Sequence, residues 1–266
     1  MTQLPPLFDT HCHCDDPAWP TEAMVAGLQA AAGWLGAVTA GYGPQRFAAS
    51  RTLCAAVPRL RRAIGLHPWW LAAHSELERE QGLAALMAEL ALGDAVALGE
   101  LGLDKNRRDQ MCADDQMRWM RRELTVARDL GLPLVLHVVG WHGHAAETLR
   151  QVSANWQGVV HRFSGPPQAV AAYAQLGLCV SLALESRPNP VKQAAAVREA
   201  DADSLMIETD WPFLDCDYPA AVTHLRALAG QIGQWRGQDP AQIIARSNAN
   251  AARVFSLPLG DPAWMP

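Results

Sequence analysis

The chain has 266 residues and a mass of 28.9 kDa, 50% of its residues are hydrophobic, and its mean hydropathy is −0.04. This composition excludes a disordered chain, because it supplies enough apolar surface for a large core. The formal net charge of −5 excludes a general basic field, so attraction to a nucleic acid would have to come from metal ions and a local group of arginines.

Two features of the sequence concern the cellular compartment. No apolar run resembles a signal peptide or reaches the roughly 18 residues that a membrane span needs. The six cysteines are scattered without a C-x-x-C pair, which is typical of a protein whose thiols stay reduced. We therefore expect a soluble, cytoplasmic protein without a membrane partner.

Strand and helix patterns alternate along the whole chain. The expected elements are strands at 7–14, 34–39, 62–67, 95–103, 134–139, 158–163, 178–184 and 204–210, with helices at 21–32, 44–56, 76–92, 113–130, 144–152, 167–176, 191–200, 219–235 and 239–255. About eight strand-helix units predict a parallel sheet that closes into a barrel. Since no linker interrupts the pattern, we expect residues 1–266 to form a single α/β domain, a TIM-type (β/α)8 barrel.

The first strand carries two histidines in an H-x-H pattern. Side chains alternate along a strand, so Asp9, His11 and His13 are expected on one face and Cys12 and Cys14 on the other. Two imidazoles that converge in this way bind a divalent cation from two sides. Because an isolated H-x-H pair also arises by chance, the prediction needs further ligands, and we expect the two cysteines to pack in the core.

Other ionisable side chains fall at the carboxyl ends of later strands, where barrels of this kind carry their active sites. They are His67, Glu100, His137, His161, Glu208 and Asp210. A mixture of imidazole and carboxylate ligands suits zinc, manganese, cobalt or magnesium and argues against a thiolate site. With so many ligands, two cations bridged by a carboxylate fit better than one, and Glu100 is the candidate bridge.

Six motifs in this order resemble the TatD family of metal-dependent hydrolases, which are described as deoxyribonucleases acting on DNA ends. They are residues 9–13 (DTHCH), 65–68 (GLHP), 99–104 (GELGLD), 132–137 (LPLVLH), 161–165 (HRFSG) and 208–214 (ETDWPFL), and Asn250 and Phe255 fit the closing pattern. The resemblance implies an amidohydrolase-like barrel. It also implies one cation on His11, His13, Glu100 and Asp210, and another on Glu100, His137 and His161.

The chemistry expected of such a site uses two divalent metal ions, Mg²⁺ or Mn²⁺ in catalysis, with Zn²⁺ as a further option. Two cations about 4 Å apart lower the pKa of a shared water toward 7 and stabilise both oxygens of a phosphodiester displacement. Asp210 is placed to take the proton from that water. Glu208 is expected behind the ligands, as their support or as a buried strut. His67 and Asp104 are not ligands in the resemblance, and each is expected to contact substrate or to serve the structure.

Two departures from the family pattern leave the substrate open. The family commonly has H-x-R at the end of the fifth strand, whereas this chain has Val139 two residues after His137, so a phosphate-binding arginine is missing there. Arg162, which stands where the family usually has cysteine, is one candidate replacement. Other cations near strand ends are Arg46, Lys105, Arg107, Arg108, Arg187 and Lys192.

Tryptophans form the second departure, because half of them fall in the expected strand-to-helix loops. They are Trp19, Trp69, Trp70, Trp141 and Trp211. Such rings would stack on unpaired bases, roof the mouth of the barrel, or narrow it for a smaller apolar substrate. Trp211, in the last motif, is expected to contact the substrate together with Arg162.

We therefore expect a two-metal phosphodiesterase that trims single-stranded or frayed DNA ends, with Asp210 and Glu100 as catalytic residues. Two alternatives stay open. The same metal pair would also hydrolyse an amide, lactone or ester of a small molecule, which the missing arginine and the tryptophans allow. A metal-loaded barrel would also serve as a non-catalytic subunit of a larger assembly.

Overall fold

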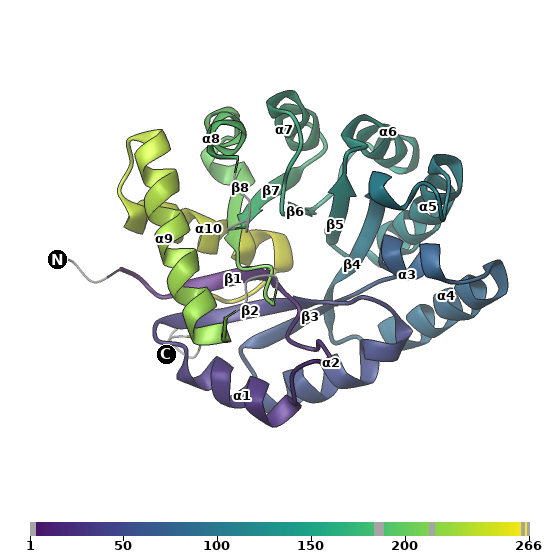
Figure 1. Cartoon of the computed structure of the whole chain (residues 1–266), viewed down its shortest axis with the longest axis horizontal. Helices are drawn as coiled ribbons and strands as arrows, with labels where there is room; N and C mark the ends of the chain where they lie inside the picture. The colour runs from purple at the N-terminus through teal and green to yellow at the C-terminus, as the bar shows by residue number, and fades with distance from the viewer. Residues whose placement is uncertain (1–3, 184–188, 213–215, 262–263, 265–266) are drawn as a thin grey trace.

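The centre of the molecule is one sheet of eight parallel strands in the order β1 to β8 (Figure 1). The computed structural model describes residues 4–183, 189–212, 216–261 and 264. The strands are β1 (Leu7–Cys12), β2 (Trp34–Ala40), β3 (Leu60–Ile64), β4 (Ala95–Asp104), β5 (Leu134–Val139), β6 (Gly158–His161), β7 (Leu178–Ala183) and β8 (Leu205–Glu208).

Backbone hydrogen bonds connect the first strand to the segment that follows the last one. The Asp210 N–H donates to the carbonyl oxygen of His11 at 3.0 Å, and the His13 N–H donates to the carbonyl oxygen of Trp211 at 2.8 Å. Each strand also pairs in parallel with the next one along the chain. The barrel that the sequence predicted is therefore confirmed.

Helices surround the barrel on its outside (Figure 1). They are α1 (Thr21–Ala30), α2 (Pro44–Ala56), α3 (Pro68–Ala73), α4 (Glu76–Leu90), α5 (Ala113–Leu130), α6 (His142–Val152), α7 (Pro167–Ala174), α8 (Pro190–Glu199), α9 (Tyr218–Arg236) and α10 (Pro240–Phe255), with 3-10 turns at Lys105–Arg107 and Ala202–Ser204. Within the described part of the chain, we find no helix that is both long and apolar enough to cross a membrane.

Local chemistry determines where these helices begin and end. α4 begins with a capping box between Ser75 and Glu78, in which each residue accepts a hydrogen bond from the backbone of the other. α5 ends at Gly131, whose left-handed φ of 65° suits glycine. α3 was not predicted, because Pro68 was expected only to stop a strand. Pro68 instead begins α3. The first N–H groups of a helix have no partner within the helix, so a proline, which lacks an N–H, costs no hydrogen bond at this position.

Apolar side chains fill the barrel at the end where the strands begin. Phe8, Val135 and Val159 on the strands pack in one cluster with Phe255 of α10. Asn248 of α10 accepts a hydrogen bond from the Phe8 N–H at 3.0 Å and so satisfies the start of β1. α10 therefore closes this end, which leaves polar chemistry to the opposite end, where the strands finish.

Candidate metal centre

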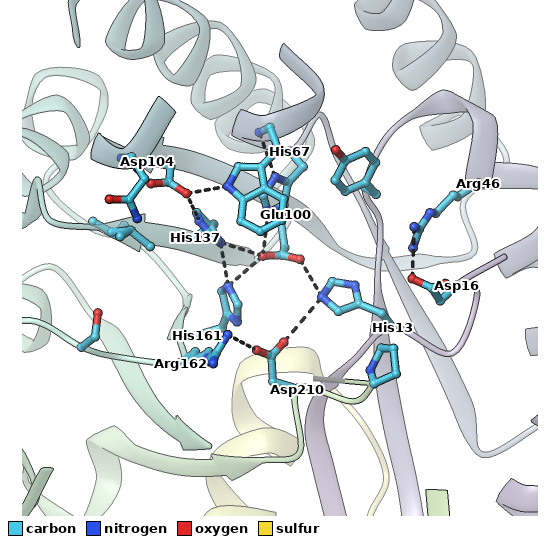
Figure 2. A pocket seen from close by; sticks show the side chains of 17 residues that line it. His13, Asp16, Arg46, His67, Glu100, Asp104, His137, His161, Arg162 and Asp210 are labelled. Atoms are coloured by element: carbon cyan, nitrogen blue, oxygen red, sulfur yellow. Dashed lines mark hydrogen bonds and ion pairs between the residues drawn. The ribbon is translucent and has the colours of Figure 1, made fainter. Parts of the chain in front are cut away.

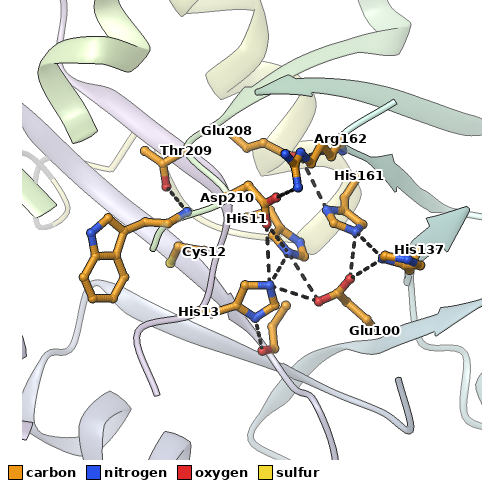
Figure 3. Close-up of polar contacts among 12 residues, drawn as sticks. His11, Cys12, His13, Glu100, His137, His161, Arg162, Glu208, Thr209 and Asp210 are labelled. Atoms are coloured by element: carbon orange, nitrogen blue, oxygen red, sulfur yellow. Dashed lines mark hydrogen bonds and ion pairs between the residues drawn. The ribbon is translucent and has the colours of Figure 1, made fainter. Parts of the chain in front are cut away.

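Six predicted ligands meet inside the barrel at the ends of the strands (Figure 3). All of them are buried. They are His11 of β1, His13 just after it, Glu100 of β4, His137 of β5, His161 of β6 and Asp210 just after β8. The structure thus brings together side chains that the sequence spreads over two hundred positions.

Glu100 reaches this position through an irregularity in β4. Gly99 pairs with Val135 of β5 but Leu101 pairs with Leu136, so Glu100 has no partner residue in the ladder. A Cβ atom on Gly99 would lie 2.4 Å from the carbonyl oxygen of Val135, so glycine is required for this close approach. The Glu100 side chain lies between the imidazoles from the neighbouring strands.

The first group of ligand atoms comes from His11, His13, Glu100 and Asp210. The two imidazole Nε2 atoms lie 3.3 Å apart. Each of them lies 3.2–3.5 Å from Oε1 of Glu100 and from Oδ1 of Asp210. In a tetrahedral site with metal-ligand distances near 2 Å, neighbouring ligand atoms are about 3.3 Å apart. Each of the two carboxylate oxygens therefore lies from both imidazole nitrogens at the spacing of ligands that share an ion.

The second group forms around the other oxygen of Glu100. Oε2 lies 2.7 Å from Nε2 of His161 and 3.3 Å from Nδ1 of His137. These two imidazole nitrogens are 3.1 Å apart. Since one oxygen of Glu100 faces each group, the carboxylate has the position of a bridging ligand.

The donor chemistry of these atoms fits divalent cations. Both oxygens of Glu100 and both of Asp210 are buried, and none accepts a hydrogen bond of ordinary geometry. A buried carboxylate without donors is costly unless positive charge compensates it. Three buried groups of ligand atoms within 4.8 Å of one another supply the mixed coordination that such ions prefer, namely His11, His161 and Asp210; His11, His13 and Glu100; and His67, Glu100 and His137.

Charge coupling among these groups links metal binding to pH. Burial lowers the pKa of His13, but the carboxylates of Glu100 and Asp210 outweigh this effect and raise the pKa to about 9. Burial raises the pKa of Glu100, but the surrounding histidines hold it well below its usual range. Because only neutral imidazole binds a metal, a cation must displace protons here, and its affinity is expected to fall at low pH.

Glu208 lies behind the second group, at the position the sequence predicted. Its Oε1 is 3.6 Å from Nδ1 of His161 and accepts the backbone N–H of Arg162, while Oε2 accepts the hydroxyl of Ser181. Arg162 has a φ of 43°, which is uncommon for a residue other than glycine. Glu208 therefore supports both His161 and the loop that carries Arg162.

Asp104 contacts His137 through its carboxylate. Oδ2 accepts hydrogen bonds from Nε2 of His137 at 3.2 Å and from the indole N–H of Trp69, and Oδ1 accepts the Asn106 N–H at 2.8 Å. Burial raises the pKa of Asp104, but these bonds outweigh it and lower the pKa to about 2. Both oxygens of Asp104 hold neighbouring groups, and the residue also lines the pocket, so its contact with substrate stays a prediction.

His67 carries its proton on Nε2. The backbone N–H of Trp69 can only donate, and it donates to Nδ1 of His67 at 2.9 Å. Burial lowers the pKa of His67 to about 4, so the ring is neutral and its proton sits on the other nitrogen. Nε2 lies 3.5 Å from Oε2 of Glu100, close enough for a ligand, but the tautomer makes His67 a hydrogen-bond donor.

A pocket of about 590 Å³ opens over the two groups of ligand atoms (Figure 2). Arg162 lies on the side of Asp210, with Nη1 3.2 Å from its Oδ2. Arg46 lies on the side of His13, with Nη2 3.2 Å from Oδ2 of Asp16. The pocket therefore has a guanidinium group on two different walls around the candidate ligands. Val139 also lines the pocket, so its side chain stands where an arginine would reach the site.

Trp211 is not available for the predicted substrate contact. Its side chain is 0% exposed, lies 4.9 Å from the ring of Trp19 between centroids, and donates its indole N–H to the Cys216 carbonyl oxygen. The prediction was wrong because a position in a loop at the rim does not determine which way a ring turns. Of the five tryptophans expected there, Trp69 lines the pocket. Among the expected cations, Arg46 and Arg162 line the pocket, and Arg187 lies outside the described residues.

The expected orientation of Asp9 was also wrong. A register shift follows Asp9 in β1, so simple alternation does not continue to the histidines. Its carboxylate accepts hydrogen bonds from the N–H and hydroxyl of Thr209 and from the hydroxyl of Tyr218. Cys12 and Cys14 pack in a buried apolar cluster, as predicted.

Tyr42 is a pocket residue that the sequence analysis missed. It is the second residue after the end of β2, and its ring stacks on His67 with centroids 5.2 Å apart. The guanidinium of Arg46 lies over the same ring at 5.1 Å. Its place just after a strand, where the tryptophans also fall, is the sequence signal that indicates this role.

Residues 8–256 match the family model described as TatD related DNase. The chain belongs to this family. A protein of Escherichia coli (strain K12) named "Uncharacterized metal-dependent hydrolase YjjV" is 31% identical over 209 residues, which are 77% of this chain and 79% of that protein. A protein of Rahnella sp. (strain Y9602) named "3'-5' ssDNA/RNA exonuclease TatD" is 32% identical over 213 residues, 73% of this chain and 76% of that protein.

Solved structures agree with the family assignment. The crystal structure of YjjV, a TatD homologue from Escherichia coli K12, has a TM-score of 0.82 at 26% identity and covers 95% of this chain and 99% of its own. A TatD family hydrolase from Entamoeba histolytica shares the fold, with a TM-score of 0.80 at 16% identity, and covers 96% of this chain and 100% of its own. The chain is therefore a metal-dependent hydrolase of the TatD family, and the alternative of a non-catalytic subunit is dropped.

Proposed function

We propose that this protein is a two-metal phosphodiesterase that removes nucleotides from single-stranded or frayed DNA ends. The observation that carries the proposal is the position of Glu100. Its two oxygens face two separate groups of imidazole and carboxylate atoms, with contacts of 3.2 Å to His13 and 2.7 Å to His161. Relatives named as 3'-5' exonucleases of single-stranded DNA and RNA support the choice of substrate.

Two divalent ions, Mg²⁺ or Mn²⁺, are the proposed cofactors. The first is assigned to His11, His13, Glu100 and Asp210, and the second to Glu100, His137 and His161. Such a pair activates a water and neutralises charge on a phosphodiester.

Asp210 is the proposed proton acceptor. Its Oδ1 faces the first group of ligand atoms at 3.5 Å from both His11 and His13. Burial raises the pKa of Asp210, but the neighbouring histidines outweigh this effect and lower it, so the group is a carboxylate at neutral pH. A carboxylate in this place can take the proton of an attacking water.

Two further residues are the proposed phosphate contacts. His67 presents a neutral Nε2–H to the pocket beside Glu100, and this donor suits a phosphate oxygen. Arg162 presents a guanidinium, which binds phosphate through two parallel hydrogen bonds. Arg162 takes the place of the arginine that the family commonly has where this chain has Val139.

The proposal is tested with purified protein, Mg²⁺ or Mn²⁺, and single-stranded DNA labelled at one end. We expect stepwise shortening of the strand, slower attack on a blunt duplex of the same sequence, and no shortening by Glu100→Ala. Strands labelled at the other end then show the direction. Absence of cleavage at full metal loading would reject the proposal.

Arg162 is tested with a pair of variants. We expect Arg162→Gln to raise KM for single-stranded DNA about tenfold or more, because it loses a charge-assisted contact. Arg162→Lys should recover part of this loss, and metal content should stay unchanged in both. Unchanged KM in Arg162→Gln would remove the residue from phosphate binding.

The second candidate activity is hydrolysis of a small amide, lactone or ester by the same metal pair. The observation that favours it is the apolar side chain of Val139 on the pocket wall. A panel of such compounds, with Glu100→Ala as the control, separates the two activities. A nuclease should leave the whole panel intact.

A further inference from the structure

α5 carries two buried polar side chains among apolar neighbours. Gln116 is 1% exposed and Glu123 is 0% exposed, and they lie about two helical turns apart, on the same face. The other buried residues of α5 include Trp119, Met120 and Leu124. A buried helix face is normally apolar, so these two polar groups need hydrogen-bond partners.

Glu123 holds the backbone just before His67. Its Oε1 accepts the backbone N–H of Leu66 at 2.8 Å. β3 ends at Ile64, so the ladder that could otherwise satisfy this N–H has already finished. Burial raises the pKa of Glu123 well above its usual range.

Once Leu66 is held, other contacts determine how His67 points. The His67 N–H donates to the carbonyl oxygen of Tyr42 at 3.1 Å, and the His67 ring stacks on the Tyr42 ring. Nδ1 accepts the Trp69 N–H, which leaves Nε2–H near Glu100. The donor that faces the pocket is therefore fixed by a chain of contacts that begins at Glu123.

Gln116 does the same for the end of β4. Its Oε1 accepts the N–H of Asp104 at 2.8 Å, and its Nε2 donates to the carbonyl oxygens of Asp104 at 3.1 Å and Met111 at 2.9 Å. Asp104 in turn accepts the hydrogen bond from His137. Gln116 therefore acts on the candidate ligand His137 only through Asp104.

We propose that α5 positions this half of the site through two residues, Glu123 acting on His67 and Gln116 acting on His137 by way of Asp104. Both are positioning residues, since neither touches the candidate ligands or the pocket. The inference rests on the proposed function, because it takes His67 to be the donor to the substrate. Without an acceptor at residue 123, the buried Leu66 N–H loses its partner and the segment shifts to find another, which turns His67 away.

The test compares Glu123→Gln, which keeps an acceptor, with Glu123→Leu, which has a similar size and none. We expect Glu123→Leu to lower kcat/KM on single-stranded DNA about tenfold with metal content unchanged, and Glu123→Gln to restore it. Met120→Leu is the matched control for a change of packing within α5, and it should have no effect. Gln116→Leu should lower metal content instead, because it acts on a ligand.

A double-mutant cycle shows whether Glu123 acts through His67. In a His67→Ala background, Glu123→Leu should cause little further loss, because the group that it positions is gone. An equal loss from Glu123→Leu in the wild-type and His67→Ala backgrounds would overturn the inference. No loss from Glu123→Leu in the wild-type background would also overturn it.

A readout without catalysis separates this inference from the proposed function. Hydrogen exchange at the amides of Leu66 and His67 should be faster in Glu123→Leu and normal in Glu123→Gln. If the wild-type protein cleaves no DNA, the proposed function fails while the exchange result still reports the positioning. Unchanged exchange in Glu123→Leu would overturn the inference whatever the activity.

Discussion

Oδ2 of Asp104 lies 3.2 Å from Nε2 of His137, whose Nδ1 lies 3.3 Å from Glu100. The imidazole therefore connects a carboxylate outside the candidate ligands with one among them. An outer carboxylate of this kind fixes the tautomer and the orientation of a metal-binding histidine. Asp104, the last residue of β4, has this place relative to His137.

Asp104→Ala should weaken the second metal position. Without its outer partner, His137 is free to rotate, and affinity for the second ion is expected to fall about 10–100-fold. Metal content after dialysis against buffered Mn²⁺ measures this loss. The control is Asp109→Ala, a carboxylate with an 86% exposed side chain near the same turn. Equal metal content in Asp104→Ala and wild type would contradict the assignment.

Asp210→Asn should separate metal binding from turnover. An asparagine still offers an oxygen to the first ion but cannot take a proton, so we expect much of the metal to remain and kcat to fall by roughly 10²–10⁴-fold. Single-turnover cleavage of single-stranded DNA measures the chemical step. Asp16→Asn, which changes a pocket carboxylate beside Arg46, is the control. A wild-type rate in Asp210→Asn would remove Asp210 from the mechanism.

Glu123→Gln should be more stable than the wild type at high pH but not at low pH. The pKa of Glu123 in the folded protein is raised above its ordinary value of 4.5, so the folded state keeps a proton that the unfolded chain has lost. Between these two pKa values, residue 123 makes the stability of the wild type fall with rising pH. The glutamine side chain does not titrate, so it causes no such fall in the variant.

Thermal unfolding of both proteins at several pH values measures the effect of Glu123. The melting temperature of Glu123→Gln should exceed that of the wild type by several degrees at pH 8, and the two should come together near pH 4. The difference between the proteins is the useful quantity, because the pH dependence of metal binding is common to both. A difference that does not change with pH would contradict a raised pKa at Glu123.

The sequence was sufficient to predict the barrel and the meeting of the candidate ligands. Alternating strand and helix patterns predict parallel strands, and all parallel strands finish at one end of the barrel. His137 and His161, for example, follow from that rule alone, and they pair directly in the ladder between β5 and β6. The sequence also predicted Glu100 as the residue between the two groups of ligands, because its strand lies midway between the strands that carry the histidines.

Other features depend on contacts that one sequence does not show. The register shift after Asp9 turns its carboxylate toward Thr209, against the simple alternation of a strand. Trp211 lies at the rim but turns inward, beneath Trp19. Glu123 is visible as a polar residue on an apolar helix face, but its partner is a backbone N–H on another element, which only the fold identifies.

The central claim is that six side chains hold two divalent ions with Glu100 between them. Anomalous diffraction from crystals soaked in Mn²⁺ tests it most directly. We predict two peaks about 3.5–4 Å apart, one among His11, His13 and Asp210 and one between His137 and His161. No peak at this place, or manganese bound only elsewhere on the protein, would contradict the account.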